Sequence, residues 1–321
     1  LGHDVYDKDW VVVGSTVEEM LSLGFSQVGK DFPVFLHPKS KEEYALARTE
    51  RKQGQGYTGF ICNADPKVTL TEDLLRRDFT INAMAMDDSG NIIDPYQGRT
   101  DLEKRILRHV SSAFSEDPLR VLRAARFSAR FHKDGLTIAS ETMELMIEIS
   151  KTKELTALSS ERVWQEMHRS LEGNDPKIFF EVLHQCHALN TIWPELEAIW
   201  EIPCSDKFNH HLSLGIRTMN KLSHAVKLSV KTTIRFAVLC LDLGRVSTQE
   251  KNYLTHNNHI DETISLINQS CIRLKVPKAH TQLALNLCQY HQQCHQAFEL
   301  SASTIVDLFN QFDAWRKPNE F

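Results

Sequence analysis

A helix is predicted to begin in the stretch EDPLRVLRAAR, residues 116–126, and the chain after it reads as helical throughout. Pro118 suits the first turn of a helix, because its missing N–H would have no partner there. Asp117 then lies at the N-cap, and Arg120 follows three residues later, so the two side chains can face each other. The earlier part of the chain instead mixes short strands with turns, which makes the predicted fold class α+β.

Asp117 and Arg120 together form one half of a base-pairing edge. A carboxylate accepts hydrogen bonds and a guanidinium donates them. Cytosine and adenine each present an amino donor beside a ring-nitrogen acceptor, so both match this pair. Uracil and guanine present a keto acceptor beside an N–H donor, so acceptor would face acceptor and donor would face donor. A buried mismatch of this kind costs about 1–3 kcal/mol per unsatisfied group. From this stretch alone, a helix cap followed by a solvated basic helix is the more common interpretation of such a pattern.

The periodicity of apolar residues predicts the other elements. Strands are expected at 9–14, 32–36, 43–47 and 79–86, with a helix over 15–23 that is capped by a Ser15/Glu18 box. Breaks at Trp193-Pro194 and Ile202-Pro203 suggest a boundary near 190–205. The predicted helices after residue 100 cover 116–132, 139–151, 160–171, 176–189, 212–244, 259–275, 280–300 and 303–314.

Composition describes an ordinary globular protein. The 321 residues are enough for two or more domains, and 41% of them are hydrophobic and 25% charged. We see no signal peptide and no membrane span, so a cytoplasmic protein is expected. The net charge of −5 means that any RNA contact must come from a local basic face. Seven scattered cysteines without a CxxC pair favour a reducing compartment.

Carboxylates near the first strand are candidates for a metal site. Asp7 and Asp9 are two residues apart, so they share one face of the predicted strand. Such oxygen ligands suit Mg²⁺, which prefers carboxylates together with substrate phosphates. Glu43 opens a later strand and could supply a third carboxylate. Taken by itself, a pair such as Asp7 and Asp9 more commonly belongs to a solvated surface.

Three further patterns contain residue types that can bind ligands. GQGYTG at 54–59 matches GxGxxG, but the following FICNADP cannot open the helix that a dinucleotide site requires. The stretch HQQCH at 291–295, with Cys288 upstream, suggests a metal site, yet no second cluster completes four ligands. Arg76 and Arg77 stand where a helical turn passes into a strand, and they suit triphosphate oxygens or a structural salt bridge.

Six motifs in one order resemble a known family, the class II tRNA nucleotidyltransferases, in the style of the gammaproteobacterial CCA-adding enzymes. They cover residues 1 to about 170 densely, and the helical remainder is compatible with the rest of the family's fold. The motifs are DKDW at 7–10, ARTERK at 47–52, RRDFTINA at 76–83, DPY with Gly98 and Asp101-Leu102 at 94–102, EDPLR at 116–120 and ERVWQE at 161–166.

The resemblance implies a polymerase-β-like nucleotidyltransferase head at 1–110, followed by an all-α neck at 111–175, body at 176–275 and tail at 276–321. It implies that the enzyme adds CCA to the 3′ end of tRNA from CTP and ATP with release of pyrophosphate, by a two-metal mechanism with Mg²⁺. The partner is the acceptor arm of tRNA, and the protein is expected to be a monomer or a weak dimer.

The same resemblance assigns roles to individual residues. Asp7 and Asp9 match metal-binding catalytic carboxylates, and Glu43 matches a third one. Asp117 and Arg120 match the pair that reads CTP and then ATP. The positions that match contacts to the incoming nucleotide are Arg77, Arg123 and Arg126.

The chain departs from the family pattern in three places. A Gly-Gly-x-x-Arg-Asp phosphate loop and its strand are expected before Leu1, and the tail stops early at Phe321. An HD phosphohydrolase pair reads Leu241-Asp242, and an expected upstream histidine is Arg217, so no HD-type phosphodiesterase or phosphatase activity is predicted. The alternative functions are a bacterial poly(A) polymerase, which normally carries a basic C-terminal extension, and a non-catalytic RNA-binding relative.

Overall fold

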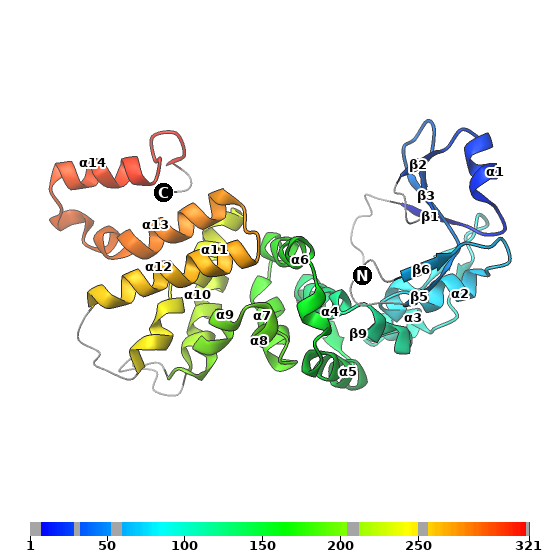
Figure 1. Ribbon diagram of the computed structural model, residues 1–321, viewed down its shortest axis with the longest axis horizontal. Coiled ribbons are helices and arrows are strands. Elements are labelled where there is room, and N and C mark those ends of the chain that lie inside the picture. Colours follow the sequence, from blue (N-terminus) through cyan, green and yellow to red (C-terminus); the bar gives the residue numbers. More distant parts are fainter. Residues whose placement is uncertain (1–7, 29–32, 53–59, 204–211, 250–255, 319–320) are drawn as a thin grey trace. The chain divides into compact units, whose positions relative to one another are not determined.

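The computed structural model describes residues 8–28, 33–52, 60–203, 212–249, 256–318 and 321. The chain divides into two compact units. The first unit comprises residues 1–120 and 133–149, and the second comprises 121–132 and 150–321. This division confirms the α+β order of elements, with strands early and helices late (Figure 1). The finer division into neck, body and tail stays a prediction.

The first unit contains a mixed four-stranded sheet in the order β1-β4-β3-β2. β1 (Asp9–Val12) is parallel to β4 (Glu43–Leu46), whereas β3 (Val34–Leu36) is antiparallel to β4 and to β2 (Ser26–Val28). One face of the sheet packs on α1 (Val17–Ser22), where Met20, Phe35 and Leu46 form a buried cluster. Because side chains alternate between faces, Asp9 and Glu43 belong to the opposite face.

The cap of α1 differs from the prediction by one residue. Thr16, not Ser15, is the N-cap, and its hydroxyl accepts from the N–H of Glu19 while the Glu19 carboxylate accepts from the N–H of Thr16. Ser15 instead donates its hydroxyl to Glu19. Two adjacent hydroxyl residues followed by two adjacent glutamates offer two registers of the same capping box, and sequence alone does not separate them.

The strand predicted over 79–86 is wrong. Phe79 forms an isolated bridge with His109, residues Thr80–Asn82 form a 3₁₀ turn, and only β7 (Ala85–Met86) is extended and pairs with β8 (Ile92–Ile93). The Thr80 hydroxyl donates to Asp101, and this tertiary contact overrides the local strand preference.

The Asp94-to-Asp101 motif builds α3 (Gly98–Glu103) around a close approach of two backbone segments. The Asp94 carboxylate accepts from the N–H groups of Gly98 and Arg99, which caps the helix. A Cβ on Gly98 would lie 2.2 Å from the carbonyl oxygen of Thr80, so only glycine is accommodated.

The first unit also contains a β5–β6 hairpin, a β9–β10 pair, a short helix and most of a longer one. These elements are β5 (Thr49–Lys52), β6 (Phe60–Asn63), α2 (Leu70–Leu75), β9 (Ile106–Leu107), β10 (Thr137–Ile138) and α5 (Ser140–Lys151).

The second unit is helical and begins within α4 (Leu119–Arg130), at Val121. Its core contains Phe236, which stacks on Trp193 and meets Trp164 edge-on, with ring centroids 5.6 and 5.5 Å apart. Two helices, separated at residues 229–231, fill most of the helical stretch predicted over 212–244. The helices are α6 (Ser160–Glu172), α7 (Pro176–Gln185), α8 (Leu189–Ile192), α9 (Pro194–Ala198), α10 (Leu214–Leu228), α11 (Thr232–Cys240), α12 (His256–Arg273), α13 (Lys278–His295) and α14 (Ala302–Gln311).

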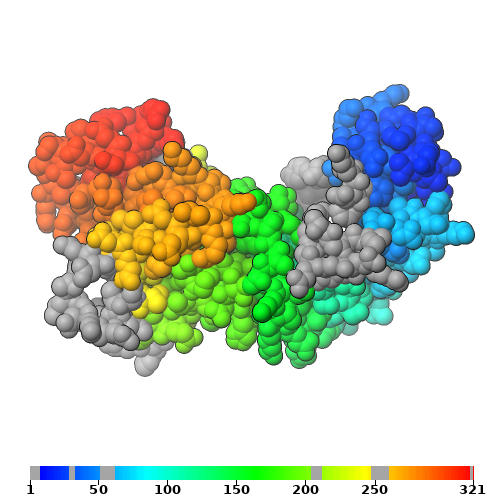
Figure 2. Space-filling view, in the orientation of Figure 1, coloured from blue at the N-terminus to red at the C-terminus, as the bar shows by residue number. Residues whose placement is uncertain are grey.

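The last two helices lie side by side. Figure 2 shows α13 and α14 as the adjoining orange and red surfaces. The Asn286 amide donates to the carbonyl oxygen of Gln311, and the rings of Tyr290 and Phe312 meet edge-on at 6.1 Å. No helix in the described ranges is both long and apolar enough to cross a membrane.

Candidate active site

Two of the predicted carboxylates are direct partners across strands. Asp9 in β1 is paired in register with Glu43 in β4, and both side chains are exposed. Paired residues of neighbouring strands project from the same face of a sheet. The third predicted carboxylate, Asp7, lies outside the described residues, as does the glycine-rich stretch at 54–59.

The donor set at this strand end fits a magnesium ion. Both described groups are carboxylates, and Mg²⁺ typically uses one or two carboxylates together with water and substrate phosphates. Within the described ranges, no group of three or more histidine, cysteine, aspartate or glutamate residues could hold a metal ion. Asp9 and Glu43 remain candidates for a two-carboxylate metal site, as predicted from the sequence.

The arginine motif is organised by a buried carboxylate that the sequence analysis did not single out. Asp73 is 1% exposed, and its Oδ1 accepts from the main-chain N–H of Arg48 and from Arg76, at 3.2 and 2.6 Å. Its Oδ2 lies 3.4 Å from the guanidinium of Arg77. Arg76 also pairs with Glu50 at 2.9 Å, so its guanidinium is committed to the protein. Arg77 is more exposed and remains the candidate for substrate contact.

Arg120 is tied to that motif through the backbone. Its guanidinium donates to the carbonyl oxygens of Ala113 and Arg76, at 2.9 and 2.5 Å. Burial lowers the pKa of Arg120, whereas the nearby carboxylates, Asp117 foremost, oppose that change. Carbonyl acceptors exist at every residue and leave no trace in the sequence, so these two contacts could not have been predicted from it.

Asp117 caps α4, as predicted from the Asp-Pro pair. Its Oδ1 accepts from the main-chain N–H of Leu119 at 3.0 Å, and its carbonyl oxygen accepts from the N–H of Arg120 at 3.0 Å. One carboxylate oxygen thus fixes the start of the helix. The orientation of this carboxylate is therefore set by its role as a cap.

Arg123 and Arg126 follow on α4, in the second unit. The guanidinium of Arg123 lies 5.7 Å from the ring centre of Phe127, and that of Arg126 lies 4.5 Å from the same centre. Arg126 also pairs at 2.5 Å with Glu166, which is 3% exposed. Arg126 therefore holds α4 against α6, a role that the sequence analysis missed although Glu166 is part of the quoted ERVWQE motif.

The predicted site residues fall into three groups by their contacts. Asp9 lies beside Glu43 at a strand end, Arg120 joins the segment of Arg76 and Arg77, and Arg126 pairs with Glu166. That these residues contact a nucleotide or a metal stays a prediction.

Comparison with known proteins identifies the family. The model of the poly A polymerase head domain matches residues 1–108, and a model described as a probable RNA- and SrmB-binding site of polymerase A matches residues 135–199. The multifunctional CCA protein of Hahella chejuensis is 53% identical over all 321 residues and 76% of its own length. That of Vibrio parahaemolyticus is 54% identical over 99% of this chain and 78% of its own length.

A solved structure agrees on the fold. A CCA-adding enzyme in an apo form matches 96% of this chain and 68% of its own chain, with 20% sequence identity and a TM-score of 0.63. Together with the polymerase head match, this confirms a nucleotidyltransferase head followed by helical domains. The chain belongs to the family of the multifunctional CCA proteins, the CCA-adding tRNA nucleotidyltransferases.

Proposed function

We propose that the chain adds CCA to the 3′ end of tRNA, from CTP and ATP and without a nucleic-acid template. The observation that carries the proposal is the attachment of Arg120 to the carbonyl oxygen of Arg76, because it couples the predicted base-reading residue to the arginine motif. We further propose that the chain binds the acceptor arm of tRNA and that it acts in the cytoplasm. Both proposals rest on its membership of the family.

We assign the chemistry to three sets of side chains. Asp9 and Glu43, with Asp7, hold magnesium, which when bound activates the tRNA 3′-hydroxyl and stabilises charge on the triphosphate. Arg77 binds phosphate oxygens of the incoming nucleotide and stabilises the departing pyrophosphate. The contact of Arg123 with the nucleotide rests on the match to the family's motif. Arg126 acts through Glu166 as a positioning residue for α4.

Base choice rests on Asp117 and Arg120. The oriented carboxylate of Asp117 accepts from the amino group of cytosine or adenine, and the guanidinium of Arg120 donates to the ring nitrogen. The tether to two carbonyl groups limits how far the Arg120 guanidinium can move. A base that presents a keto group toward Asp117 leaves two acceptors facing each other and is rejected.

The test uses tRNA that lacks its 3′ end, incubated with labelled CTP, ATP, UTP or GTP singly and in pairs. Two cytidines followed by one adenosine are expected, with Mg²⁺ required. Long adenosine tails would instead support the poly(A) polymerase, the alternative suggested by the head-domain match. Absence of any incorporation, with RNA binding retained, would support a non-catalytic RNA-binding relative.

A further inference from the structure

A stacked pair of aromatic rings lies on the other side of the sheet from the candidate metal site. Asp9 is paired with Glu43 across β1 and β4. The next pair along the same two strands is Trp10 with Tyr44, whose rings are parallel to within 9° and have centroids 5.4 Å apart. Since successive side chains of a strand point to opposite faces, the ring pair occupies the face that packs on α1 and the carboxylates occupy the other.

Tyr44 joins this ring pair to the core of the first unit. It packs against the buried cluster that contains Phe35 and Leu46. Its ring also meets that of Phe25 edge-on, with centroids 5.1 Å apart. Trp10 is 37% exposed, so one side of its ring rests on Tyr44 while part of it faces solvent. The ring pair therefore fastens β1, a strand of four residues, to a fixed position in the core.

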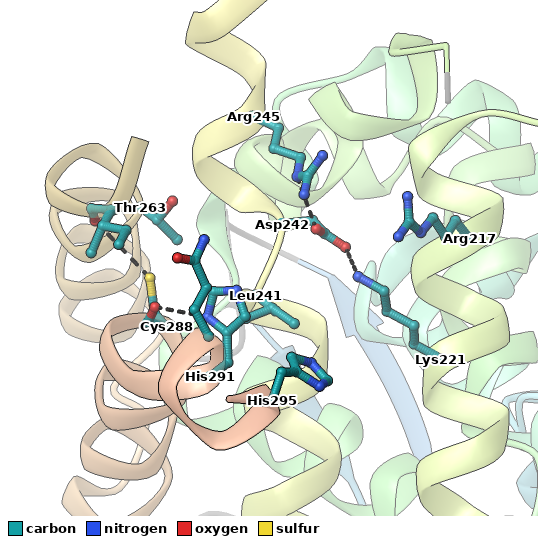
Figure 3. A pocket seen from close by; sticks show the side chains of 11 residues that line it. Arg217, Lys221, Leu241, Asp242, Arg245, Thr263, Cys288, His291 and His295 are labelled. Atoms are coloured by element: carbon teal, nitrogen blue, oxygen red, sulfur yellow. Dashed lines mark hydrogen bonds and ion pairs between the residues drawn. The ribbon is translucent and has the colours of Figure 1, made fainter. Parts of the chain in front are cut away.

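The carboxylate pair opposes the same register. Neighbouring strands lie about 4.8 Å apart, and like charges that face each other across two strands repel. A carboxylate of the second unit shows how such a charge is offset inside a protein: Asp242 pairs with Lys221 and lies 3.2 Å from Arg245 (Figure 3). Among the residues that the structure describes, neither Asp9 nor Glu43 forms an ion pair of that kind. A divalent cation bound between them supplies the counter-charge.

The register of β1 decides whether the two carboxylates can share a ligand. A shift of the strand by one residue exchanges its two faces, so Asp9 would turn toward α1 and Trp10 would turn away from it. Trp10 would then lose its contact with Tyr44. Because stacked aromatic rings stabilise a structure beyond the area that they bury, the contact disfavours the shift. It stabilises the register in which both carboxylates project from one face.

We propose that Trp10 and Tyr44 are positioning residues for the metal site, because their stack holds Asp9 opposite Glu43 before a cation binds. The proposal rests on the proposed function, which assigns magnesium to these carboxylates. Both rings act through the carboxylates, since they lie on the other face of the sheet. Without the stack, the binding-competent register is only partly populated, and the apparent affinity for the cation falls by that fraction.

The test measures Mn²⁺ binding to the full chain by electron paramagnetic resonance, in which the free ion gives the sharp signal. Mn²⁺ takes the same oxygen ligands as Mg²⁺. The binding that Asp9→Ala removes defines the site. Trp10→Ala is expected to raise the Mn²⁺ dissociation constant of this site about three- to tenfold, and Tyr44→Leu should do the same. Trp10→Phe keeps a ring that can stack, so its affinity should stay within about twofold of the wild type.

Two controls separate positioning from general stability. Met20→Ala opens a cavity in the same core, so it should lower the melting temperature and leave the Mn²⁺ affinity of the folded protein unchanged. Val28→Ala removes an apolar side chain of similar exposure, 38%, from β2 of the same sheet and should also leave the affinity unchanged. Trp10→Leu keeps an apolar side chain without a ring, and it replaces Trp10→Ala if that variant is unfolded at the assay temperature.

A second measurement follows CCA addition as a function of Mg²⁺ concentration. Trp10→Ala should need more Mg²⁺ for its half-maximal rate, while its rate at saturating Mg²⁺ stays within about twofold of the wild type. The proposal is overturned if the Trp10 variants without a ring bind Mn²⁺ as tightly as the wild type, or lose no more affinity than Met20→Ala. If Asp9→Ala leaves Mn²⁺ binding intact, the assignment of the metal to Asp9 fails first, and the positioning role fails with it.

Discussion

The guanidinium of Arg120 donates to the main-chain carbonyl oxygen of Arg76, 44 residues earlier in the chain. Arg76 in turn is held by Asp73 and Glu50, so the residue predicted to read the base is attached to a network of ion pairs. The predicted base-reading residue and the arginine motif are therefore mechanically linked in the first unit.

Asp117 combines a cap with a predicted role in base reading, and two substitutions separate them. Asp117→Ala removes both, so we expect relaxed nucleotide choice and a loss of about 1 kcal/mol of stability. Asp117→Asn keeps an oxygen that can accept from Leu119 but adds an amide donor, so stability stays near the wild type while UTP or GTP incorporation rises. Misincorporation with single nucleotides and urea unfolding measure the two effects; unchanged selectivity in both variants would refute the reading role.

Asp9 is expected to be indispensable for the reaction. Asp9→Ala should abolish incorporation of both CTP and ATP, because it removes one member of the carboxylate pair with Glu43. Nucleotide binding measured without metal should change little. Asp88→Ala, at an exposed position of the same unit, is the control and should retain activity. Residual activity of Asp9→Ala above one tenth of the wild type would argue against the assignment.

Asp73 should contribute to stability through its buried contacts. Asp73→Asn leaves Arg76 and Arg77 with a weakened partner, and we expect a loss of about 2–3 kcal/mol in the free energy of unfolding. Because Arg76 holds Arg120, nucleotide selectivity should fall as well. Asp88→Asn is the matched control. A stable variant with unchanged selectivity would contradict the link between the two.

Arg126 and Glu166 should be energetically coupled. In a double-mutant cycle with Arg126→Gln and Glu166→Gln, we expect a coupling free energy of about 1–3 kcal/mol, because each single change strands a buried charge. Denaturant unfolding of the four proteins measures it. Additive effects would show instead that Arg126 acts independently of Glu166, as a direct nucleotide contact would.

His280 should make stability depend on pH. Burial, followed by the nearby His168, lowers the pKa of His280 to about 4. The unfolded state, with a pKa near 6.5, therefore takes up the proton first, and stability falls as the pH drops from about 6.5 to about 4. His280→Gln should flatten that part of the melting-temperature profile, whereas His224→Gln, at an exposed position, should not. An unchanged profile in His280→Gln would exclude this origin.

Much of the fold could be predicted because long helices carry a repeated apolar pattern. The predicted helix 139–151 is α5 (Ser140–Lys151), and the predicted strand 43–47 is β4 to within one residue. Short elements were less certain: the sequence 79–86 alternates like a strand, yet Thr80 bonds to Asp101, which no local pattern reveals. Contacts between distant segments were the main omission, because Asp73 and Glu166 look like ordinary helix residues until their arginine partners are seen.

The motif residues themselves were identifiable, since carboxylates and arginines in ordered motifs stand out. The register that places Asp9 beside Glu43 could not be identified from the sequence. Periodicity determines which residues share one face of a strand, but not which strand pairs with it. The resemblance to a family supplied the grouping that local rules could not.

The acceptors of Arg120 are backbone atoms, and this affects how the site tolerates change over evolution. A substitution at position 113 replaces a side chain but leaves the carbonyl group in place. The acceptors that hold Arg120 therefore depend on the course of the main chain, and they are retained as long as the fold is retained. Sequence drift at Ala113 can proceed without loosening the arginine, while the arginine itself has no such freedom.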